Sequence, residues 1–461
     1  MSNPTSRRFF LGAATAAAAT RVWGANDKIN VAIIGLGGRG NNHLDIYDKL
    51  PGARVAGLCD VDQAARETAQ AKLLKATGEK AKEFEDMRQA FSDGGVDAVS
   101  IATPNHWHAL ATIWACKAGK DVYCEKPASY NIHEGLKMLQ VARETKKMVQ
   151  IGSQHRSNPM KIKAMEAVKG GLIGKVYQAK GLCFKRRVSI GHKDNEPTPP
   201  GVNWDLFLGP APMRPFNALR FKYNWHWFWD TGNGDIGNQG VHEMGIARWG
   251  MGDPEWPKSV VCTGGKFAYT DDQETPNTQH AVFDFGGREL VFEVRGLLTN
   301  GEGVPPPVPV RRPRPGQENA APAPPVKRPE NALNVMVGDI FFGTEGWMAM
   351  SDQGVQAYKG ESNELIYEER PARRGADAGA EGGDPTRAHM ENFLSACRSR
   401  NEKELHDGIA NASLSAAMCH LANISYRVGR KLTIEAGPKF TGDAVATSMI
   451  TREKYRAPYV V

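Results

Sequence analysis

Residues 29–40 read Ile-Asn-Val-Ala-Ile-Ile-Gly-Leu-Gly-Gly-Arg-Gly, and this stretch gives the strongest indication of how the chain folds. The first six residues are mainly apolar and predict a strand buried on both faces of a sheet. They lead directly into the pattern G-x-G-x-x-G, formed by Gly35, Leu36, Gly37, Gly38, Arg39 and Gly40. In this pattern the glycines allow a tight turn, a close approach of backbone to a pyrophosphate, and packing of the next helix on the strand. The N–H groups and dipole at the start of that helix favour an anion.

A second expected strand, residues 54–59, ends in Asp60, which lies twenty residues after Gly40. An acidic residue in this place accepts hydrogen bonds from the adenosine ribose hydroxyls and repels a 2′-phosphate. Strand, glycine turn, helix, strand and acid together predict a dinucleotide site rather than a glycine-rich turn without function. Because no arginine follows Asp60 closely in the sequence, we expect NAD rather than NADP.

The alternation of strands and helices continues to residue 151. Expected helices cover residues 63–76, 108–118 and 132–146, and expected strands cover 97–102, 121–124 and 148–151. Strands separated by helices of this length indicate βαβ units and a doubly wound parallel sheet, so residues 26–151 are predicted to form a Rossmann domain. Two of its strands end in polar segments, Thr103-Pro104-Asn105-His106 and Glu125-Lys126-Pro127. The carboxyl ends of parallel strands hold ligands, so these segments are predicted to face the nucleotide. Lys126 could also be only a solvated charge at a strand end.

The pattern changes after residue 152, where strands follow one another without helices between them. Such strands predict a mostly antiparallel open sheet, and hence an α+β domain over residues 152–440. A Pro-rich surface insertion is expected at 303–330, and a C-terminal tail at 441–461. The expected strands are 175–185, 259–269, 280–285, 289–294, 346–351 and 354–358, and the expected helices are 159–169, 386–399 and 405–428.

The composition excludes several classes of protein. With 461 residues, of which 41% are hydrophobic and 24% charged, the chain has the composition of a soluble globular protein and the length of two domains. Its formal net charge of +7 comes without long basic runs, so no nucleic-acid partner is expected. The seven cysteines never form a C-x-x-C pair, and we expect them to be buried apolar side chains rather than disulfides or zinc ligands.

The N-terminal segment, residues 1–25, predicts export. Arg7 and Arg8 precede Phe-Phe-Leu and a short alanine-rich apolar run. Twin arginines ahead of such a run are typical of a twin-arginine (Tat) signal, and a disordered basic tail would not explain the apolar residues. The run is too short for a membrane span. We therefore expect a periplasmic or other extracytoplasmic protein, exported already folded and without a stable membrane anchor.

Two clusters combine aromatic residues with histidine. In residues 105–108, His106 and His108 have the spacing of metal ligands, but no third ligand is implied, so no metal is expected. The second cluster, residues 223–230, contains three tryptophans, Trp225, Trp227 and Trp229. Aromatic rings beside polar groups suit the apolar faces and hydroxyls of a sugar. The alternative interpretation of these tryptophans is a core between two domains.

These motifs in this order resemble the Gfo/Idh/MocA oxidoreductase family, whose members include glucose–fructose oxidoreductase and inositol dehydrogenase. The resemblance rests on G-x-G-x-x-G at residues 35–40, T-P-N-x-x-H from Thr103, E-K-P from Glu125, and a glycine-rich segment that ends in His242. It covers nearly all of the chain after the N-terminal segment. It implies that Lys126, the lysine of E-K-P, contacts the nicotinamide and the reacting hydroxyl, and that His242 serves as the acid/base.

The motifs above, together with the resemblance, give the remaining expected site residues. The expected cofactor contacts are Gly35, Leu36, Gly37, Gly38, Arg39, Gly40, Asp60, Thr103, Pro104, Asn105, His108, Glu125 and Lys126. The expected substrate contacts are Gln154, Arg156, Trp225, Trp227, Trp229, Asp235, Asn238 and His242. One position departs from the family, because Asn238 stands where many members have an aspartate. No carboxylate is available at that position, although Asp235 and Glu243 are close in the sequence.

The expected reaction transfers a hydride from a secondary hydroxyl of a sugar, cyclitol or glycoside to NAD+, while a base takes the hydroxyl proton. Lys126 can act as that base only if burial beside a cationic nicotinamide lowers its pKa, whereas His242 needs no such shift. Either residue can be the base, with the other polarising the hydroxyl. Free NAD is not expected to be plentiful outside the cytoplasm, so an exported enzyme is expected to keep its cofactor and regenerate it within each turnover.

Three functions stay open at this point. A second substrate can re-oxidise the bound NADH, as the resemblance to glucose–fructose oxidoreductase implies. Alternatively, transient oxidation of a sugar can drive elimination of a leaving group before the hydride returns, as in the NAD-dependent glycoside hydrolases of this family. The third is a non-catalytic sugar-binding protein, against which Lys126 and the glycine turn argue. A homo-dimer or homo-tetramer is expected by analogy with relatives.

Overall fold

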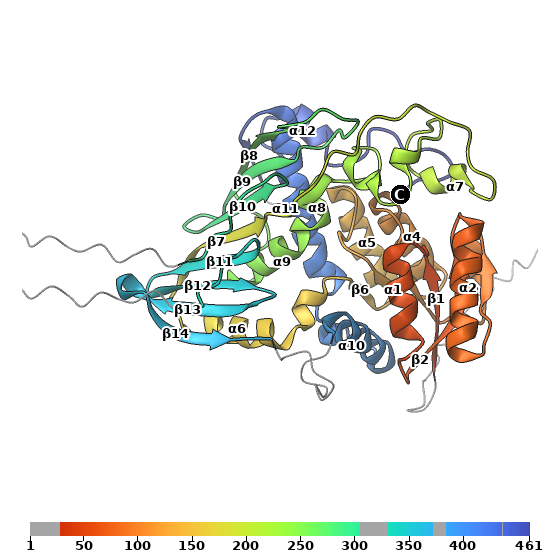
Figure 1. Cartoon of the computed structure of the whole chain (residues 1–461), viewed down its shortest axis with the longest axis horizontal. Coiled ribbons are helices and arrows are strands. Elements are labelled where there is room, and N and C mark those ends of the chain that lie inside the picture. The colour runs from red at the N-terminus through yellow and green to blue at the C-terminus, as the bar shows by residue number, and fades with distance from the viewer. Residues whose placement is uncertain (1–27, 305–330, 372–383, 436) are drawn as a thin grey trace, which may run out of the picture.

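The computed structural model describes residues 28–304, 331–371, 384–435 and 437–461. The expected export signal at 1–25, nearly all of the expected insertion at 303–330 and the glycine-rich stretch 373–383 lie outside the described residues. The described chain forms two parts, which Figure 1 shows side by side. One is built on a parallel sheet, and the other on a larger, mixed sheet.

The first part is a Rossmann fold, as predicted. Its sheet has the strand order β3-β2-β1-β4-β5-β6, and every pair of neighbours is parallel. The central strands are buried along their length, which explains why their sequences are apolar rather than alternating. The strands are β1 (Ile29–Ile34), β2 (Ala53–Cys59), β3 (Lys82–Phe84), β4 (Ala98–Ile101), β5 (Asp121–Cys124) and β6 (Val149–Ile151).

Five helices connect these strands. They are α1 (Gly38–Tyr47), α2 (Gln63–Thr77), α3 (Met87–Ser92), α4 (Asn105–Lys117) and α5 (Ile132–Thr145). The helix α4 begins three residues earlier than expected, because Pro104 takes an extended conformation as its N-cap and Asn105 is already helical. The short elements β3 and α3 were not predicted.

The second part contains a nine-stranded sheet with the order β14-β13-β12-β11-β7-β10-β9-β8-β15. Only the β7–β10 pair is parallel among its described pairs, which confirms the prediction of a mostly antiparallel sheet. The strands β11, β14 and β15 were not predicted. The strands are β7 (Val176–Cys183), β8 (Ser259–Gly265), β9 (Thr278–Asp284), β10 (Glu289–Arg295), β11 (Val337–Gly343), β12 (Gly346–Ser351), β13 (Gly354–Lys359), β14 (Glu364–Glu369) and β15 (Leu432–Thr433).

Helices pack on one face of this sheet and enclose an apolar core (Figure 1). The longest, α11, begins at Ile409 rather than at 405, after a short 3-10 turn (η6) at Glu402–Glu404. The helices that follow β6 are α6 (Pro159–Lys169), α7 (Trp204–Leu208), α8 (Gly234–Asn238), α9 (Gly240–Gly250), α10 (Pro385–Ser399), α11 (Ile409–Val428) and α12 (Ala444–Ser448), and 3-10 turns lie at η1 (Gln154–Ser157) and η3 (Asn224–Trp227).

The C-terminal region returns to the Rossmann part. Met390, Phe393 and Leu394 of α10 share an apolar cluster with strands β1 and β2. Tyr459, close to the chain end, lies against Trp107 with ring centroids 5.4 Å apart. Residues that the sequence assigned to the second domain and to the tail therefore complete the core of the first.

Two further features bear on the class of protein. The seven cysteines are all buried and unpaired, which confirms their prediction as apolar core residues. Within the described ranges, no helix combines the length and apolarity that a membrane crossing requires.

Candidate active site

The glycine turn between β1 and α1 forms an open cradle. Gly35 has φ +90°, and a Cβ there would lie 2.8 Å from the carbonyl oxygen of Ala102. A Cβ at Gly40 would lie 1.8 Å from the carbonyl oxygen of Gly35, so strand and helix touch at this point. At Gly37 and Gly38, in contrast, a Cβ would meet nothing within 4 Å. No side chain caps the first turn of the ten-residue α1, so its N–H groups are available to an anion. The cradle fits the pyrophosphate of a dinucleotide.

Asp60 closes the turn at the end of β2. Its Oδ2 accepts a hydrogen bond from the Leu36 N–H at 2.6 Å, and its Oδ1 accepts one from the Asp62 N–H at 2.9 Å. The guanidinium of Arg66 donates to the backbone oxygen of Asp60 at 2.6 Å. The preference for NAD assumed that no arginine follows Asp60 closely in the sequence. In the fold, however, the first turn of α2 brings the Arg66 side chain back to Asp60, so an arginine does lie beside it. The structure thus places both a carboxylate and a guanidinium at the end of β2.

The ends of β4 and β5 are tied to each other and to α1. His108 spans the two loops, with Nδ1 2.7 Å from the Pro127 oxygen and Nε2 2.9 Å from the Thr103 oxygen. Glu125 accepts hydrogen bonds from Arg39 at 2.7 Å and contacts His43 at 3.0 Å. Burial works against this carboxylate, but the charge of Arg39 and the contact with His43 hold its pKa well below the usual range. Glu125 is thus an anionic anchor for the glycine turn.

Lys126 reaches across to the second part of the fold. Its Nζ donates to the backbone oxygen of Asn238 at 3.0 Å and to the Oδ1 of the same residue at 3.3 Å. No described carboxylate pairs with it, and burial lowers its pKa against the raising effect of the neighbouring Glu125. A lysine in this state can give up its proton more readily than a solvated one. The interpretation of Lys126 as a solvated cap is wrong.

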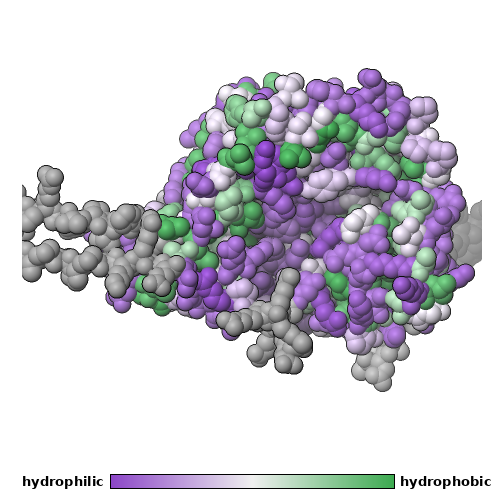
Figure 2. Space-filling model, viewed as in Figure 1, coloured by the Kyte–Doolittle hydropathy of each residue, from purple (hydrophilic) through white to green (hydrophobic). Residues whose placement is uncertain are grey.

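A cavity of about 790 Å³ runs along the carboxyl edge of the Rossmann sheet, a size within the range of small-molecule sites. It collects nearly all of the expected cofactor residues, while Gly40 lies outside it and only packs. Figure 2, which has the view of Figure 1, shows the surface hollowed between the two parts, with hydrophilic side chains in the hollow. The expected residues that line the cavity are Gly35, Leu36, Gly37, Gly38, Arg39, Asp60, Thr103, Pro104, Asn105, His108, Glu125, Lys126, Trp225 and Asn238.

A segment of the second part closes the cavity from the other side. We call residues 196–229, which include α7, the crossover segment; in Figure 1 it runs across the top of the Rossmann part. Its backbone joins the loop after β2, where the Gln63 N–H donates to the Gly201 oxygen and the Asn203 N–H donates to the Val61 oxygen, both at 2.9 Å. The Trp107 indole donates to two carbonyls of α7 at 3.0 Å. Sequence reasoning missed its cavity-lining residues Leu206, Phe207, Phe221, Lys222, Tyr223 and His226.

His242 lies close to the cavity but does not line it. It follows Asn238 by four residues across α8 and α9, where the chain stays helical, so the two side chains share a face. Its Nδ1 is buried and has no hydrogen-bond partner among the described residues. Burial lowers the pKa of His242 well below its usual value, and the nearby His155 and Lys126 lower it further. His242 is therefore held as a neutral imidazole.

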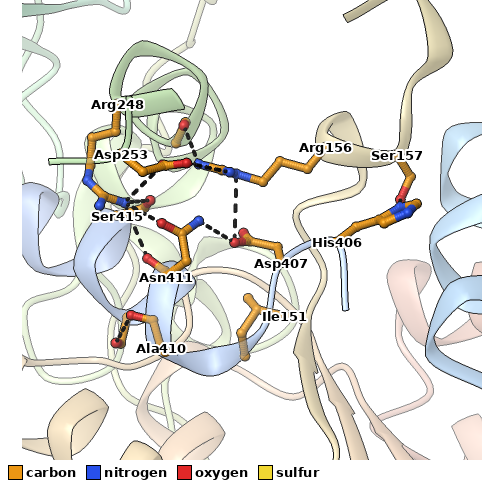
Figure 3. A network of polar contacts seen from close by, with 12 residues as sticks. Ile151, Arg156, Ser157, Arg248, Asp253, His406, Asp407, Ala410, Asn411 and Ser415 are labelled. Carbon is orange, nitrogen blue, oxygen red and sulfur yellow. Dashed lines mark hydrogen bonds and ion pairs between the residues drawn. The ribbon is translucent and has the colours of Figure 1, made fainter. Parts of the chain in front are cut away.

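The two expected substrate contacts from η1, the turn after β6, lie outside the cavity. Arg156 donates to Asp253 at 2.6 Å and lies 3.7 Å from Asp407, within a buried network that also holds Arg248 (Figure 3). This places Arg156 in a structural ion-pair network rather than at the cavity. Gln154 does not line the cavity either, and its Oε1 is buried without a partner among the described residues.

The three tryptophans divide between the two interpretations. Trp225 lines the cavity and stacks on His226, with ring centroids 3.6 Å apart. Trp227 is buried, with the guanidinium of Arg187 over its ring. The side chain of Trp229 lies instead beside Arg427. Only Trp225 is therefore placed to contact a ligand.

Asp235 also lies outside the cavity lining. Its carboxylate forms a bidentate pair with Arg187, at 2.6 and 2.8 Å. Arg187 in turn donates to the hydroxyl of Tyr223, which does line the cavity. Asp235 is thus committed to an ion pair, and it reaches the cavity through Tyr223 and through a 3.5 Å hydrogen bond from the Asn238 amide.

A Rossmann sheet whose glycine turn, acidic strand end and lysine strand end line one cavity defines a dinucleotide-binding protein of two parts. Residues 29–153 match the Gfo/Idh/MocA model described as an oxidoreductase family with an NAD-binding Rossmann fold. Residues 155–264 match the companion model, described as the C-terminal alpha/beta domain of that oxidoreductase family. The chain belongs to the Gfo/Idh/MocA oxidoreductase family.

Curated relatives match over part of their length. A glycosyl hydrolase family 109 protein of Streptomyces niveus is 32% identical over 301 residues, which are 58% of this chain and 58% of that protein. An inositol 2-dehydrogenase of Rubrobacter xylanophilus is 32% identical over 154 residues, which are 33% of this chain and 42% of that protein. The chain thus matches about half the length of these relatives.

Solved structures share the fold over most of the chain. Levoglucosan dehydrogenase in complex with NADH and levoglucosan has a TM-score of 0.61 at 16% identity, covering 89% of this chain and 100% of that one. The WlbA dehydrogenase from Bordetella pertussis in complex with NADH and UDP-GlcNAcA has a TM-score of 0.58 at 18% identity, covering 89% and 98%. At such identities the likeness extends to the fold alone.

Proposed function

We propose that this protein is an NAD-dependent oxidoreductase that acts on a secondary hydroxyl of a sugar, cyclitol or glycoside and keeps its cofactor bound through turnover. Membership of an oxidoreductase family with an NAD-binding Rossmann fold supports the reaction class. The open cradle at Gly37 and the carboxylate of Asp60 support the cofactor. The match to inositol 2-dehydrogenases supports a polyhydroxylated substrate.

The crossover segment is the observation that carries the proposal of a retained cofactor. Its residues and those of the Rossmann edge line the same cavity, so a dinucleotide in that cavity lies between them. The segment is joined to the Rossmann part at both ends. Asn203 bonds Val61 near its start, and the Trp229 oxygen accepts from the Tyr130 hydroxyl at its end. These bonds hold the segment over the cavity and so oppose release of the dinucleotide. A retained cofactor also agrees with the proposed export of the folded protein through a twin-arginine signal.

Bound NAD+ supplies the hydride acceptor. The Lys126 ammonium, held by Asn238 at the end of the cavity, polarises the substrate hydroxyl. His242 is neutral and lies on the same helical face as Asn238, so it takes the hydroxyl proton and later returns it. Trp225 offers an apolar ring to one face of the sugar.

A second candidate function is NAD-dependent glycoside hydrolysis by transient oxidation. The likeness to a glycosyl hydrolase family 109 protein favours it, because that match extends over 301 residues and thus beyond the Rossmann part. The same residues would serve, since Lys126 and His242 would assist oxidation of the hydroxyl to a carbonyl and, once the leaving group has been eliminated and water has added, reduction of the carbonyl back to the hydroxyl. The two functions differ in whether NADH accumulates.

A substrate panel without added cofactor separates the candidates. The full-length protein is incubated with myo-inositol, with aldoses and with p-nitrophenyl glycosides, while absorbance is followed at the wavelengths of NADH and of nitrophenol. Formation of NADH that a second substrate re-oxidises supports the oxidoreductase. Release of nitrophenol without net NADH supports the hydrolase. Silence on all substrates, with NAD bound, would contradict both and favour a sugar-binding protein.

A further inference from the structure

Three charged or titratable side chains lie beside His242, outside the lining of the cavity. The ring of His155, in η1, stacks on the ring of His242 with centroids 4.9 Å apart and an interplanar angle of 29°. Lys161, in the first turn of α6, directs its ammonium at Nδ1 of His155 and donates a hydrogen bond to it. The same ammonium lies 2.7 Å from Oδ1 of Asp352, in the turn between β12 and β13. These residues come from four separate elements that pack together, and α6 lies beside β13 in Figure 1.

We propose that Asp352, Lys161 and His155 form a positioning triad for His242: the anchored ammonium holds His155 neutral, with its proton on Nε2, and the neutral ring supports His242 when His242 takes up the substrate proton. This inference rests on the acid/base role proposed for His242. Asp352, Lys161 and His155 are positioning residues, because they act through His242: His155 stacks on its ring, and the Lys161–Asp352 pair contacts His155.

The hydrogen bond determines the tautomer of His155. An ammonium group only donates, so the lone pair of Nδ1 must accept and the single ring proton must lie on Nε2. The side chain of Lys161 is buried, with 4% exposed. The side chain of Asp352 is 73% exposed, and its carboxylate pairs with the buried ammonium from the surface side. The anchored pair is therefore a fixed donor rather than a mobile surface lysine.

The electrostatics agree with this geometry. Burial lowers the pKa of His155 to about 3; the charge of Lys161 adds to this effect, and that of Asp352 opposes it. The remaining charged groups that act on His155 are His389 and Lys126. Besides His155, those that act on His242 are Lys126, Glu125 and Arg39, and only Glu125 favours its protonation. The His155 ring is thus kept uncharged beside a residue that must become charged.

A neutral ring is the better neighbour for a protonated imidazole. An imidazolium is attracted to the face of an uncharged aromatic ring and repelled by a second imidazolium. If His155 were protonated, the proton uptake of His242 would be opposed at a centroid distance of 4.9 Å. The Lys161–Asp352 pair prevents that competition.

The tautomer and titration of His155 can be read without any substrate. The full-length protein with its retained cofactor is labelled with ¹³C,¹⁵N-histidine, and ring resonances are followed by NMR from pH 5 to 9. Loss of a signal in His155→Gln and in His242→Gln assigns the two residues. In the wild type, we expect His155 to show the Nε2–H tautomer throughout and not to titrate. In Lys161→Met, we expect a mixture of tautomers, an upward shift of the His155 titration, and a change in the His242 resonance.

Matched variants separate positioning from folding. Lys161→Arg keeps the donor and the charge and should restore the wild-type signals. Lys163→Met removes a lysine of the same helix that is 64% exposed and paired with Glu369 at 3.8 Å, and should change neither resonance. If Lys161→Met does not fold, Asp352→Asn on the surface releases the ammonium and should also give mixed tautomers.

Unchanged His155 and His242 resonances in folded Lys161→Met, or in Asp352→Asn, would overturn the triad. A substrate panel in which neither NADH nor nitrophenol forms would instead count against the proposed function. The two failures are distinguishable because the NMR signals do not depend on turnover.

Discussion

Gly209 tests how firmly the crossover segment is held on the Rossmann part. It follows α7 with φ +46° and ψ −117°, a conformation that favours glycine. A Cβ at this position would lie 2.1 Å from Cζ2 and 2.3 Å from Cε2 of the Trp107 indole. Trp107 is 3% exposed and donates from Nε1 to the Leu206 and Phe207 oxygens, both at 3.0 Å. Gly209→Ala must therefore displace the indole that joins the segment to α4.

The size of the effect follows from these contacts. At φ +46° and ψ −117°, outside the left-handed helical region, backbone strain costs alanine at least about 1 kcal/mol. Loss of the indole hydrogen bonds and of its close packing adds about 2 kcal/mol. We expect Gly209→Ala to lower the free energy of unfolding by at least about 3 kcal/mol. If the loss of about 2 kcal/mol at Trp107 lowers the free energy of opening the crossover segment by the same amount, bound NAD should dissociate roughly 30-fold faster.

Gly191→Ala is the matched control. Gly191 lies in the same β7–α8 connection with φ +73°, but a Cβ there would meet nothing within 4 Å. We expect only the backbone cost, about 1 kcal/mol, and no faster loss of cofactor. Denaturant unfolding gives the stabilities, and chromatography of nucleotide released during dialysis gives the loss rates. The same stability and the same loss rate in both variants would refute the claim that Trp107 fastens the segment over the cofactor.

Three further perturbations test the site and its surroundings. Lys126→Met should lower turnover by at least about 100-fold while bound NAD stays at the wild-type level, and full turnover with NAD bound would remove Lys126 from the chemistry. Trp225→Ala should raise KM for the sugar, whereas Trp229→Ala, whose ring lies beside Arg427 and outside the cavity, should not; equal effects would contradict the division of the tryptophans. Burial lowers the pKa of His389 and of His420 to about 4, so the folded state binds fewer protons than the unfolded state between that value and about 6.5. Their contribution to stability is complete above about pH 6.5 and is lost as the pH falls, by on the order of 4 kcal/mol for the pair at pH 5; a free energy of unfolding that does not fall over this range would contradict it.

The Rossmann half could be predicted from sequence because its signals are local. The glycine turn and Asp60 each act through the backbone conformation or the strand end at which they stand. Even so, Arg66 was overlooked, since a residue six positions later is brought beside Asp60 only by the turn of α2. Local spacing thus predicted residues that line the cavity, but not every charge around them.

The second half depends on contacts between distant segments. Arg156 is tied to Asp253 and Asp407, 97 and 251 positions away, and nothing beside it in the sequence indicates that its charge is already neutralised. Trp225 and Trp227 belong to a short 3-10 turn, which directs neighbouring side chains to different sides. Asp339 interrupts the apolar residues of β11 and is itself buried, which hid that strand from the pattern.

The crossover segment was visible in the sequence only as a Pro/Trp-rich region without strands. Its role depends on backbone bonds from Gly201 and Asn203 to the loop after β2, which no side-chain pattern encodes. Polar backbone groups bond wherever a partner strand or loop comes close, whatever the side chain. For this reason the position of the crossover segment over the cavity could be seen in the structure but not predicted from the sequence motifs.

The nucleotide content of the purified protein tests the central claim most directly. The full-length chain is purified without added cofactor and dialysed extensively, and the nucleotide released on denaturation is identified and counted by chromatography. A cofactor enclosed between the Rossmann edge and the crossover segment predicts close to one NAD(H) per chain, without NADP(H). Protein that carries no nucleotide after this treatment, yet binds and releases added NAD freely, would contradict the account.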